Sequence, residues 1–268
     1  MLNQEQELRF CKARRASIAR DFGTLNPEQQ KAVLATEGPL LLLAGAGSGK
    51  TTVLINRIAN LMQYGRGSDS PEVPEWVTPD DLEFLERYAA TGEGDKGRQE
   101  QLCRLEPAAP WTILAITFTN KAAGELNDRL ARRLGPAAND IWASTFHSAC
   151  VRILRRDIEK LGFASSFTIY DTDDSLRVVK DCLKDLNLDD KQFPPRSVLG
   201  YISRAKDEMK LADDYLAECQ KAGDFRLTRI AKIYGEYQRR LWEANALDFD
   251  DIILHTVRLL QKFDDVRE

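Results

Sequence analysis

Residues 39–51 read PLLLLAGAGSGKT, and this stretch decides the fold that we expect. Its four consecutive leucines, Leu40 to Leu43, form an apolar run typical of a strand that is buried on both faces. The glycines that follow predict a tight loop, and residues 53–62 continue with the apolar period of a helix. A buried strand, a glycine-rich loop and a helix together predict an α/β protein with a parallel sheet.

The glycine-rich loop has the composition of a phosphate-binding loop. It matches the pattern G-x-x-x-x-G-K-[ST], except that Ala44 stands at the first position. Glycines let backbone N–H groups turn toward phosphate oxygens, and the start of the next helix adds partial positive charge. We expect Lys50 to reach the β- and γ-phosphates and the Thr51 hydroxyl to bind Mg²⁺. The predicted nucleotide-binding residues of this loop are Ala44, Gly45, Ala46, Gly47, Ser48, Gly49, Lys50, Thr51 and Thr52. A glycine-rich turn with an incidental lysine is the less favoured alternative.

Charge and composition exclude several other classes of protein. The 42 acidic and 38 basic residues leave a net charge of −4, so nucleic acid would have to bind a local basic surface. The five cysteines are an odd number and widely spaced, and only two histidines are present, which argues against disulfide frameworks and His-rich metal sites. No apolar run reaches the roughly 18 residues of a membrane span, and no secretory leader is visible. We therefore expect a cytoplasmic protein that does not bind membranes.

The front half of the chain continues the α/β pattern around an acidic insertion. Residues 113–117 and 140–144 are predicted strands, and each precedes a helical pattern. Residues 66–110 hold eleven acidic and five basic residues and five of the ten prolines, which predicts a loop-rich insertion with one helix near 81–90. Residues 1–24 are expected to form a peripheral helix that ends at Gly23.

The back half is expected to be all-helical. We find no strand pattern after residue 149, and helical periods separated by glycine and proline occupy 149–161, 173–186, 195–210, 213–221 and 225–244.

Three further segments are expected to meet the phosphate loop. LNPEQ (25–29) begins a helix, with Asn26 as cap and Pro27 in its first position. ITFTNKAA (116–123) and STFHS (144–148) follow the second and third strands, and ligands of open α/β sheets bind at the carboxyl ends of strands. Hydroxyls and a lysine can hold phosphates while phenylalanine rings stack on bases, so these segments suit single-stranded nucleic acid.

Together these segments resemble the Q motif and motifs I, Ia and Ib of superfamily 1 helicases of the UvrD/PcrA/Rep type. LDFDD (247–251) also resembles a segment at which the helical insertion of that family rejoins the first RecA-like domain. The similarity runs from about residue 24 to the end, interrupted by residues 66–110. It implies a RecA-like P-loop parallel sheet with helices on both faces and an inserted helical subdomain. The implied domains are 1–163, the N-terminal part of the RecA-like domain with 66–110 as its insertion; 164–246, the helical subdomain; and 247–268, the return.

The resemblance also implies roles for individual residues. Gln29 would hydrogen-bond the adenine of ATP, with Mg²⁺ on Thr51. The residues that would line a DNA track are Thr117, Phe118, Thr119, Asn120, Lys121, Thr145, Phe146 and His147. Phe118 would be the main stacking ring. The implied activity is ATP-dependent unwinding of DNA in repair or replication, in the 3′ to 5′ direction, with a duplex junction as a further partner of the full protein. We expect a monomer, although the sequence leaves the oligomeric state open.

Hydrolysis of ATP needs groups that we do not find in these 268 residues. The family supplies them as an Asp-Glu pair at the end of an apolar strand, whereas Asp207-Glu208 follows a helical pattern. We therefore expect an N-terminal fragment of a helicase that binds ATP without hydrolysing it.

Several alternatives stay open at this point. Phe118 and Phe146 could be core aromatics, and His147 could be structural. The pairs Arg132-Arg133, Arg155-Arg156 and Arg239-Arg240 are more simply solvated helix faces than phosphate contacts. Asp173-Asp174 and Asp250-Asp251 fit helix capping better than metal binding, although Asp250 and Asp251 are the first carboxylates to consider for catalysis.

Other kinds of protein also carry phosphate loops. A GTPase would need a carboxylate where Ala123 follows Asn120-Lys121-Ala122, and a small-molecule kinase would need an arginine-rich lid, which we do not see. A self-contained P-loop nucleotide-binding or protein-interaction module is the remaining alternative.

Overall fold

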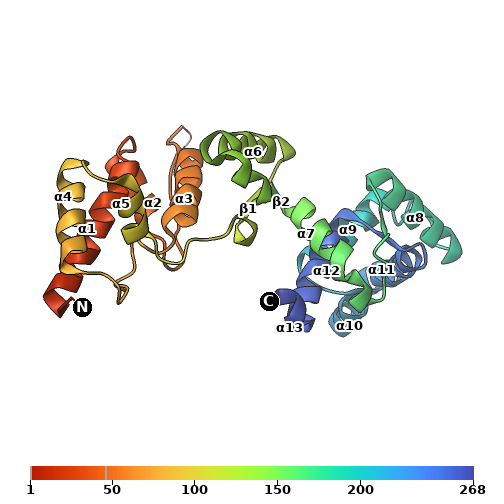
Figure 1. Ribbon diagram of the computed structural model, residues 1–268. Helices are drawn as coiled ribbons and strands as arrows, with labels where there is room; N and C mark the ends of the chain where they lie inside the picture. The colour runs from red at the N-terminus through yellow and green to blue at the C-terminus, as the bar shows by residue number, and fades with distance from the viewer. Residues whose placement is uncertain (1, 46) are drawn as a thin grey trace. The chain divides into compact units, whose positions relative to one another are not determined.

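The computed structural model describes residues 2–45 and 47–268, and the chain divides into two compact units, residues 1–144 and 145–268 (Figure 1). Each unit is treated by itself. Within the described residues the chain is mostly helical, and its strands form two sheets of two strands each. No helix in this part of the chain is both long and apolar enough to cross a membrane. The domain boundaries at residues 163 and 246 stay a prediction.

The first unit alternates helices with short connections. Its elements are α1 (Gln4–Asp21), α2 (Pro27–Leu34), α3 (Lys50–Tyr64), α4 (Pro79–Thr91), α5 (Lys96–Cys103), η1 (Pro110–Thr112), β1 (Leu114–Thr117), α6 (Asn120–Leu134), η2 (Gly135–Asp140) and β2 (Trp142–Thr145), whose last residue belongs to the second unit. The predicted strands at 113–117 and 140–144 are confirmed as β1 and β2, which pair with each other. The expected helices at 53–62 and 81–90 are confirmed as α3 and α4.

The structure adds to two expectations about the first unit. The helix expected to be peripheral, α1, buries Phe10 and Ile18 against α4, which lies beside it in Figure 1. The insertion expected to be loop-rich contains both α4 and α5 and contributes Leu82, Leu85 and Leu102 to the same core. The sequence does not show which segment either of them packs against. In the structure the apolar side chains of α1 and of the insertion are buried against each other.

The leucine run at residues 40–43 is not a strand in this structure, which corrects the prediction from its apolar pattern. Leu41 is 80% exposed and Leu43 is 88% exposed. A strand requires a hydrogen-bonded neighbour, and no described segment forms a ladder with residues 39–43. The expected RecA-like sheet is therefore formed only in part, by the pairing of β1 with β2.

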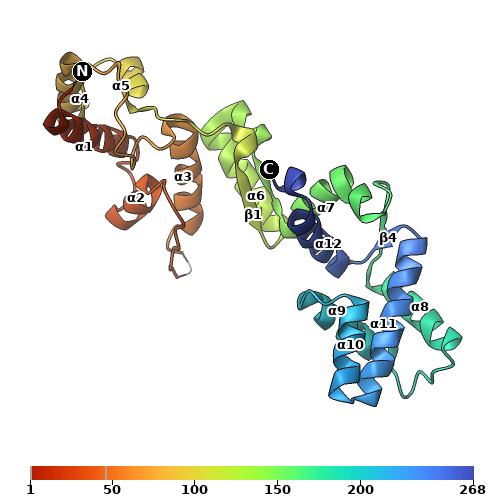
Figure 2. The same ribbon diagram turned by 90° about the horizontal axis from the view of Figure 1, so that it is seen from below.

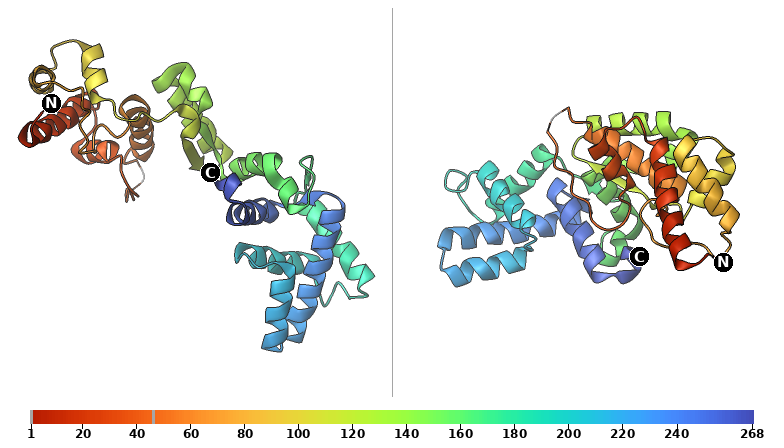
Figure 3. Two further views of the ribbon diagram at one scale, coloured as in Figure 1. Left: turned by 60° about the horizontal axis from the view of Figure 1, so that its bottom comes forward. Right: turned by 90° about the vertical axis from the view of Figure 1, so that its left-hand side faces the viewer.

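The second unit is built from helices around one very short sheet. Its elements are α7 (Phe146–Asp157), η3 (Ile158–Leu161), β3 (Thr168–Ile169), α8 (Thr172–Asp185), α9 (Pro195–Asp207), α10 (Ala212–Ala222), α11 (Phe225–Glu243), β4 (Ala246–Leu247), α12 (Phe249–Lys262) and α13 (Asp264–Arg267). The five helices expected between residues 149 and 244 are confirmed as α7 to α11, and α10 packs beside α11 (Figure 3).

Strands β3 and β4 contradict the expectation that no strand follows residue 149. They pair in parallel, with Thr168 opposite Ala246 and Ile169 opposite Leu247, and Figure 2 labels β4 where the chain passes from α11 to α12. Two residues are too few for a visible sequence pattern, so only the long-range pairing defines these strands. The pairing places Thr168 beside Ala246, near the two ends of the predicted segment 164–246.

A buried ion-pair cluster joins three helices of the second unit. The Lys206 ammonium on α9 lies 2.6 Å from Asp248 Oδ2 and 2.8 Å from Asp251 Oδ1, both at the start of α12. Tyr237 on α11 donates its hydroxyl hydrogen to Asp248 Oδ2, and Gln238 donates to Asp251 Oδ1. Lys206 and Asp251 are 2% and 0% exposed, so the cluster is shielded from solvent.

Burial and mutual attraction oppose each other within this cluster. Burial raises the pKa of Asp251 to about 6, and the neighbouring Asp248 carboxylate adds to that effect. For Asp248 burial acts in the same direction, but the Lys206 charge and several hydrogen bonds outweigh it and lower the pKa. Burial also lowers the pKa of nearby His255 to about 3, helped by Arg258, so this imidazole stays neutral. The single positive charge of Lys206 therefore pairs with two carboxylates, those of Asp248 and Asp251.

Substitution of Lys206 by methionine should destabilise the second unit strongly. Removal of one partner from a buried ion pair leaves uncompensated charge and typically costs about 3–5 kcal/mol. Urea unfolding followed by far-UV circular dichroism measures the loss. Lys184→Met is the matched control, because Lys184 forms an exposed pair with Asp181 at 3.4 Å, and exposed pairs contribute about 0–1 kcal/mol. Equal stability of the two variants would show that the buried cluster is not formed.

Candidate nucleotide-binding site

Helix α2 carries Gln29 and begins as the sequence predicts. Asn26 caps the helix, with its side chain accepting a hydrogen bond from Gln29 N at 2.9 Å, and Pro27 occupies the first turn. The Gln29 side chain closes a reciprocal capping box by accepting from Asn26 N at 3.2 Å. Its Nε2 also donates to Ser48 O at 3.0 Å, which joins α2 directly to the phosphate loop.

The phosphate loop curls in the way that its glycines allow. Gly47 and Gly49 have φ angles of 76° and 83°, in the left-handed region. The left-handed backbone at Gly49 favours glycine, and a Cβ there would lie 2.6 Å from Gln29 Nε2, so the Gln29 side chain would have to move. The Ser48 hydroxyl donates to Gly45 O at 2.7 Å and tightens the turn. Ala46, which the sequence places among the binding residues, lies outside the described residues.

Helix α3 begins at Lys50, whose side chain folds back over the loop. The ammonium donates to Ala44 O at 2.9 Å and to Gly45 O at 2.6 Å. Thr51 and Thr52 are exposed in the first turn of the helix, where backbone N–H groups lack intrahelical partners. A hollow of about 380 Å³ adjoins these elements, and its lining includes Asn26, Gln29, Leu41, Ser48, Lys50 and Val53.

This donor set fits a triphosphate. Backbone N–H groups at the start of α3 and the Lys50 ammonium are groups that can bind phosphate, and the exposed Thr51 hydroxyl is suited to Mg²⁺. Among residues 2–45 and 47–268 no group of three or more His, Cys, Asp or Glu side chains could hold a metal ion by itself.

The segment predicted to contact DNA in the first unit lies at the end of β1. Phe118 is 89% exposed, which contradicts the alternative that it is a core aromatic. Thr119 caps α6 by accepting from Ala122 N at 3.1 Å, and Thr117 donates its hydroxyl hydrogen to Thr119 O. Asn120 and Lys121 are exposed in the first turn of α6. The exposed side chains could meet a ligand, whereas the Thr119 hydroxyl already has a structural role.

The remaining predicted DNA contacts, Thr145, Phe146 and His147, belong to the second unit. Thr145 is buried and caps α7, with its hydroxyl 2.9 Å from that of Ser148. Phe146 is 43% exposed, and the His147 ring packs edge-on against Phe249 with 5.6 Å between ring centroids. The His147 contact resembles a structural role more closely than the predicted one, but the DNA assignment stays a prediction.

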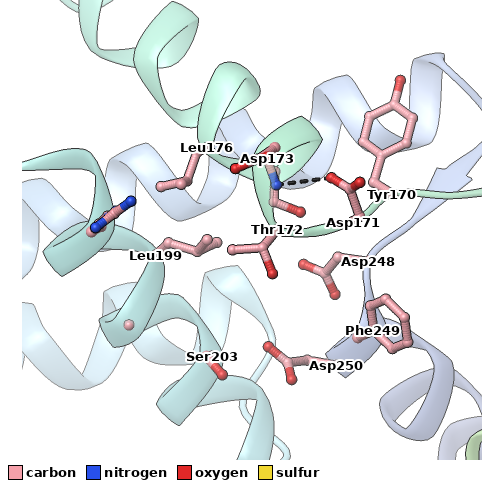
Figure 4. A pocket seen from close by; sticks show the side chains of 13 residues that line it. Tyr170, Asp171, Thr172, Asp173, Leu176, Leu199, Ser203, Asp248, Phe249 and Asp250 are labelled. Atoms are coloured by element: carbon pink, nitrogen blue, oxygen red, sulfur yellow. Dashed lines mark hydrogen bonds between the residues drawn. The ribbon is translucent and has the colours of Figure 1, made fainter.

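One residue of each acidic pair completes a helix cap, which favours the simpler alternative. Asp174 completes a capping box with Asp171 at the start of α8, and Asp251 does the same with Asp248 at the start of α12. Figure 4 shows the hollow of about 460 Å³ between these helix starts, with the Asp250 and Ser203 side chains on one side of it. Burial raises the pKa of Asp250. The Asp251 carboxylate forms an ion pair with Lys206, so it is a poor candidate for holding catalytic Mg²⁺.

The arginine pairs are largely engaged within the protein. Arg239 pairs with Glu236 and Glu243, and Arg240 pairs with Glu236 and Asp185. Arg155 lies over the Phe167 ring at 3.8 Å and donates to Ser165 O. Two further arginines of these pairs have local contacts: Arg156 with Asp157, and Arg132 with the Asp128 carbonyl. These contacts favour the solvated-face alternative over phosphate binding.

Sequence reasoning missed two features of the predicted binding segments, one in each unit. Asn26 was expected only as a cap, but it also lines the hollow beside Gln29. Its position three residues before Gln29 was the available signal, since a capping box places both side chains at one helix end. Ser148 forms a hydroxyl pair with Thr145, and its spacing at the start of α7 could have indicated that contact.

Comparison with known proteins places these elements in a family. The sequence model of the UvrD/REP helicase N-terminal domain matches residues 25–71 and 98–268. The chain is 44% identical over 244 residues to the ATP-dependent DNA helicase PcrA of Bacillus subtilis (strain 168). It is 42% identical to PcrA of Staphylococcus epidermidis (strain RP62A) and 41% identical to that of Staphylococcus aureus (strain Mu50). Each alignment covers 91% of this chain and 27% of the relative.

The matched residues include α2 with Gln29, the phosphate loop, and the segments at the ends of β1 and β2. The chain thus belongs to the UvrD/REP helicase family and corresponds to its N-terminal domain.

Proposed function

We propose that this chain is the ATP-binding and single-stranded-DNA-contacting portion of an ATP-dependent DNA helicase. The observation that carries the proposal is the junction of Gln29, Ser48 and Lys50, which joins a helix that can read a base to a loop that can hold phosphates. The printed names of the relatives, ATP-dependent DNA helicases, support it.

Gln29 keeps enough hydrogen-bonding capacity to bind adenine. Its amide nitrogen has two hydrogens, and its amide oxygen has two lone pairs. One hydrogen goes to Ser48 O and one lone pair to Asn26 N, which leaves one donor and one acceptor for the edge of the base. The bond to Ser48 would hold the amide in one orientation relative to the phosphates.

When nucleotide binds, the Lys50 ammonium would donate its hydrogen bonds to phosphate oxygens instead of to the carbonyls of the loop. The ammonium now donates to two neutral carbonyls, Ala44 O and Gly45 O, and hydrogen bonds to an anion are stronger than these. Bound Mg²⁺ would neutralise phosphate charge. The role of Thr51 would be to orient its hydroxyl toward that ion from the first turn of α3.

Single-stranded DNA would contact the exposed residues at the end of β1. Phe118 can stack on a base, while Asn120 and Lys121 can contact the neighbouring phosphates. We propose separately that Thr145, Phe146 and His147 of the second unit contact single-stranded DNA. We also propose, from the resemblance alone, 3′ to 5′ unwinding in DNA repair or replication, a duplex junction as partner of the longer protein, a cytoplasmic location and a monomeric state.

Loss of the Lys50 ammonium should weaken nucleotide binding. Removal of a charge-assisted contact to phosphate costs about 1.5–3 kcal/mol, roughly a 10- to 150-fold change in Kd. Titration of a fluorescent ATP analogue with Mg²⁺ against wild type and Lys50→Ala measures it. Lys12→Ala removes another exposed lysine of the first unit and serves as the matched control. Affinities that agree for wild type and Lys50→Ala would contradict the proposal.

Loss of the Phe118 ring should weaken binding of single-stranded DNA. Stacking on one aromatic ring contributes about 1–3 kcal/mol, and phosphate contacts should make the affinity fall steeply with salt. Fluorescence anisotropy with an oligo-dT compares Phe118→Ala with Phe225→Ala, a ring of nearly equal exposure in the second unit. If the two variants bind DNA equally well, Phe118 does not stack on bases.

The 268-residue chain should bind ATP without turning it over. The pair Asp207-Glu208 lies at the end of helix α9 rather than at the end of an apolar strand. The Asp251 carboxylate forms an ion pair with Lys206. Hydrolysis depends on groups that act in the transition state, and an arginine finger alone can contribute roughly 10³–10⁵ in rate. Phosphate release is followed with ATP, Mg²⁺ and single-stranded DNA, with Lys50→Ala as the background. Turnover that disappears in Lys50→Ala would show that a catalytic carboxylate is present, and Asp250 would be tested first.

A further inference from the structure

Two segments of the chain lie outside the match to the family's N-terminal domain, and they fold together. Residues 1–24 and 72–97 are unmatched, and they contain α1 and α4 respectively. The two helices lie side by side in Figure 1 and share a core that includes Phe10, Ile18 and Leu85, all almost fully buried. We call residues 4–22 together with residues 72–97 the accessory module.

Arginines of α1, among them Arg9, Arg14 and Arg20, hold the insertion in place. Arg9 pairs with Glu86 at 2.7 Å on the surface. The guanidinium of Arg14, which is 1% exposed, donates to Glu72 O at 2.7 Å and to Ser70 O at 2.5 Å. Arg20 donates to the carbonyls of Ala89, Ala90 and Thr91 and thereby satisfies the C-terminal end of α4. The module is therefore joined by polar contacts along the whole length of α1.

The accessory module contacts the nucleotide-binding elements first through Gln30. This side chain donates from Nε2 to Ala19 O at 2.9 Å and to Phe22 O at 3.3 Å, at the C-terminal end of α1. Gln30 directly follows Gln29 on α2, and Gln29 donates to Ser48 of the phosphate loop. A displacement of α1 would therefore change the position of α2, the helix that carries Gln29.

The second contact lies at the far end of α3, the helix that begins at Lys50. Tyr64 is its last residue, is fully buried, and donates its hydroxyl hydrogen to Asp21 Oδ2 on α1. Lys96 of the insertion lies 2.8 Å from Asp21 Oδ1 and 3.2 Å from the Tyr64 hydroxyl. Burial and the adjacent Asp21 carboxylate raise the pKa of Tyr64, so the hydroxyl keeps its proton.

We propose that the accessory module positions α2 and α3 for nucleotide binding, with Gln30 and Tyr64 as the positioning residues. This inference rests on the proposed ATP-binding function. Because α3 is a single helix with Lys50 at one end and Tyr64 at the other, a change in how Tyr64 is held alters the orientation of the phosphate loop's lysine. A protein that occupies the binding-competent arrangement only part of the time binds nucleotide more weakly in proportion.

The test compares two conservative tyrosine substitutions. Tyr64→Phe removes the hydroxyl that reaches Asp21, whereas Tyr88→Phe removes a hydroxyl from a buried ring of α4 within the module. Gln30→Leu removes the other contact. The Kd of a fluorescent ATP analogue with Mg²⁺ is measured at 15 °C, with circular dichroism confirming that each variant is folded at that temperature. We expect Tyr64→Phe and Gln30→Leu to weaken binding about three- to tenfold, and Tyr88→Phe to change it less than twofold.

A merely structural role would lower the thermal midpoint and leave the Kd at 15 °C unchanged, and that result would overturn the proposal. Amide hydrogen exchange at residues 53–57 of α3 gives a readout that does not need nucleotide. If the wild-type chain binds no ATP analogue, the proposed function fails, and the exchange rates decide this inference alone. Faster exchange in Tyr64→Phe than in Tyr88→Phe would then support positioning, and equal exchange would exclude it.

Discussion

Gly49 turns the chain into α3 with a φ of 83°, and a side chain here would lie 2.6 Å from the amide nitrogen of Gln29. The elements of the candidate nucleotide site meet at this turn. Next to it Gln29 donates to Ser48 O, and α3 begins at Lys50, where the first-turn N–H groups lack intrahelical partners. The conformational freedom of one glycine therefore couples a base-reading amide to a phosphate-binding lysine.

Helix α3 extends that coupling into the rest of the unit. Its side chains Ile55 and Ile58 pack in one core with Ala115 and Leu126 of β1 and α6. Its polar residue Asn60 donates to Val33 O on α2, and its last residue, Tyr64, reaches α1. A helix that is held on several sides can present Lys50 in a defined orientation. In this way the accessory module would influence the position of Lys50 without contacting the site.

The second unit relies on a different kind of constraint. Lys206, Asp248 and Asp251 hold α9 and α12 together through buried charges, with Tyr237 of α11 donating to the same carboxylate. Such a cluster contributes less net stability than an apolar core of the same size, but its geometry tolerates few alternatives. The same charges explain why Asp251, which the sequence offers as a catalytic carboxylate, has a structural role instead.

Local patterns in the sequence were sufficient for the phosphate loop, for the cap and first turn of α2, and for most helices. Each of these depends on residues within a few positions of one another, such as Asn26, Pro27 and Gln29. The leucine run at 40–43 was misleading because an apolar pattern indicates that a strand could be buried and does not supply the neighbouring strand. The family of the protein could also be recognised from the sequence, since its motifs are short and contiguous.

Only the tertiary structure decided the contacts between distant segments. Arg9 and Glu86 are 77 positions apart, and Lys206 and Asp248 are 42 apart, with no periodicity to connect them. Strands β3 and β4 are two residues each and exist only because the chain returns alongside itself. The sequence by itself determined which residues could bind phosphate, because that chemistry lies within one loop and one helix start. Which helices support that loop, and which carboxylates are neutralised, depended on long-range packing, because burial and charge compensation arise only when distant side chains meet.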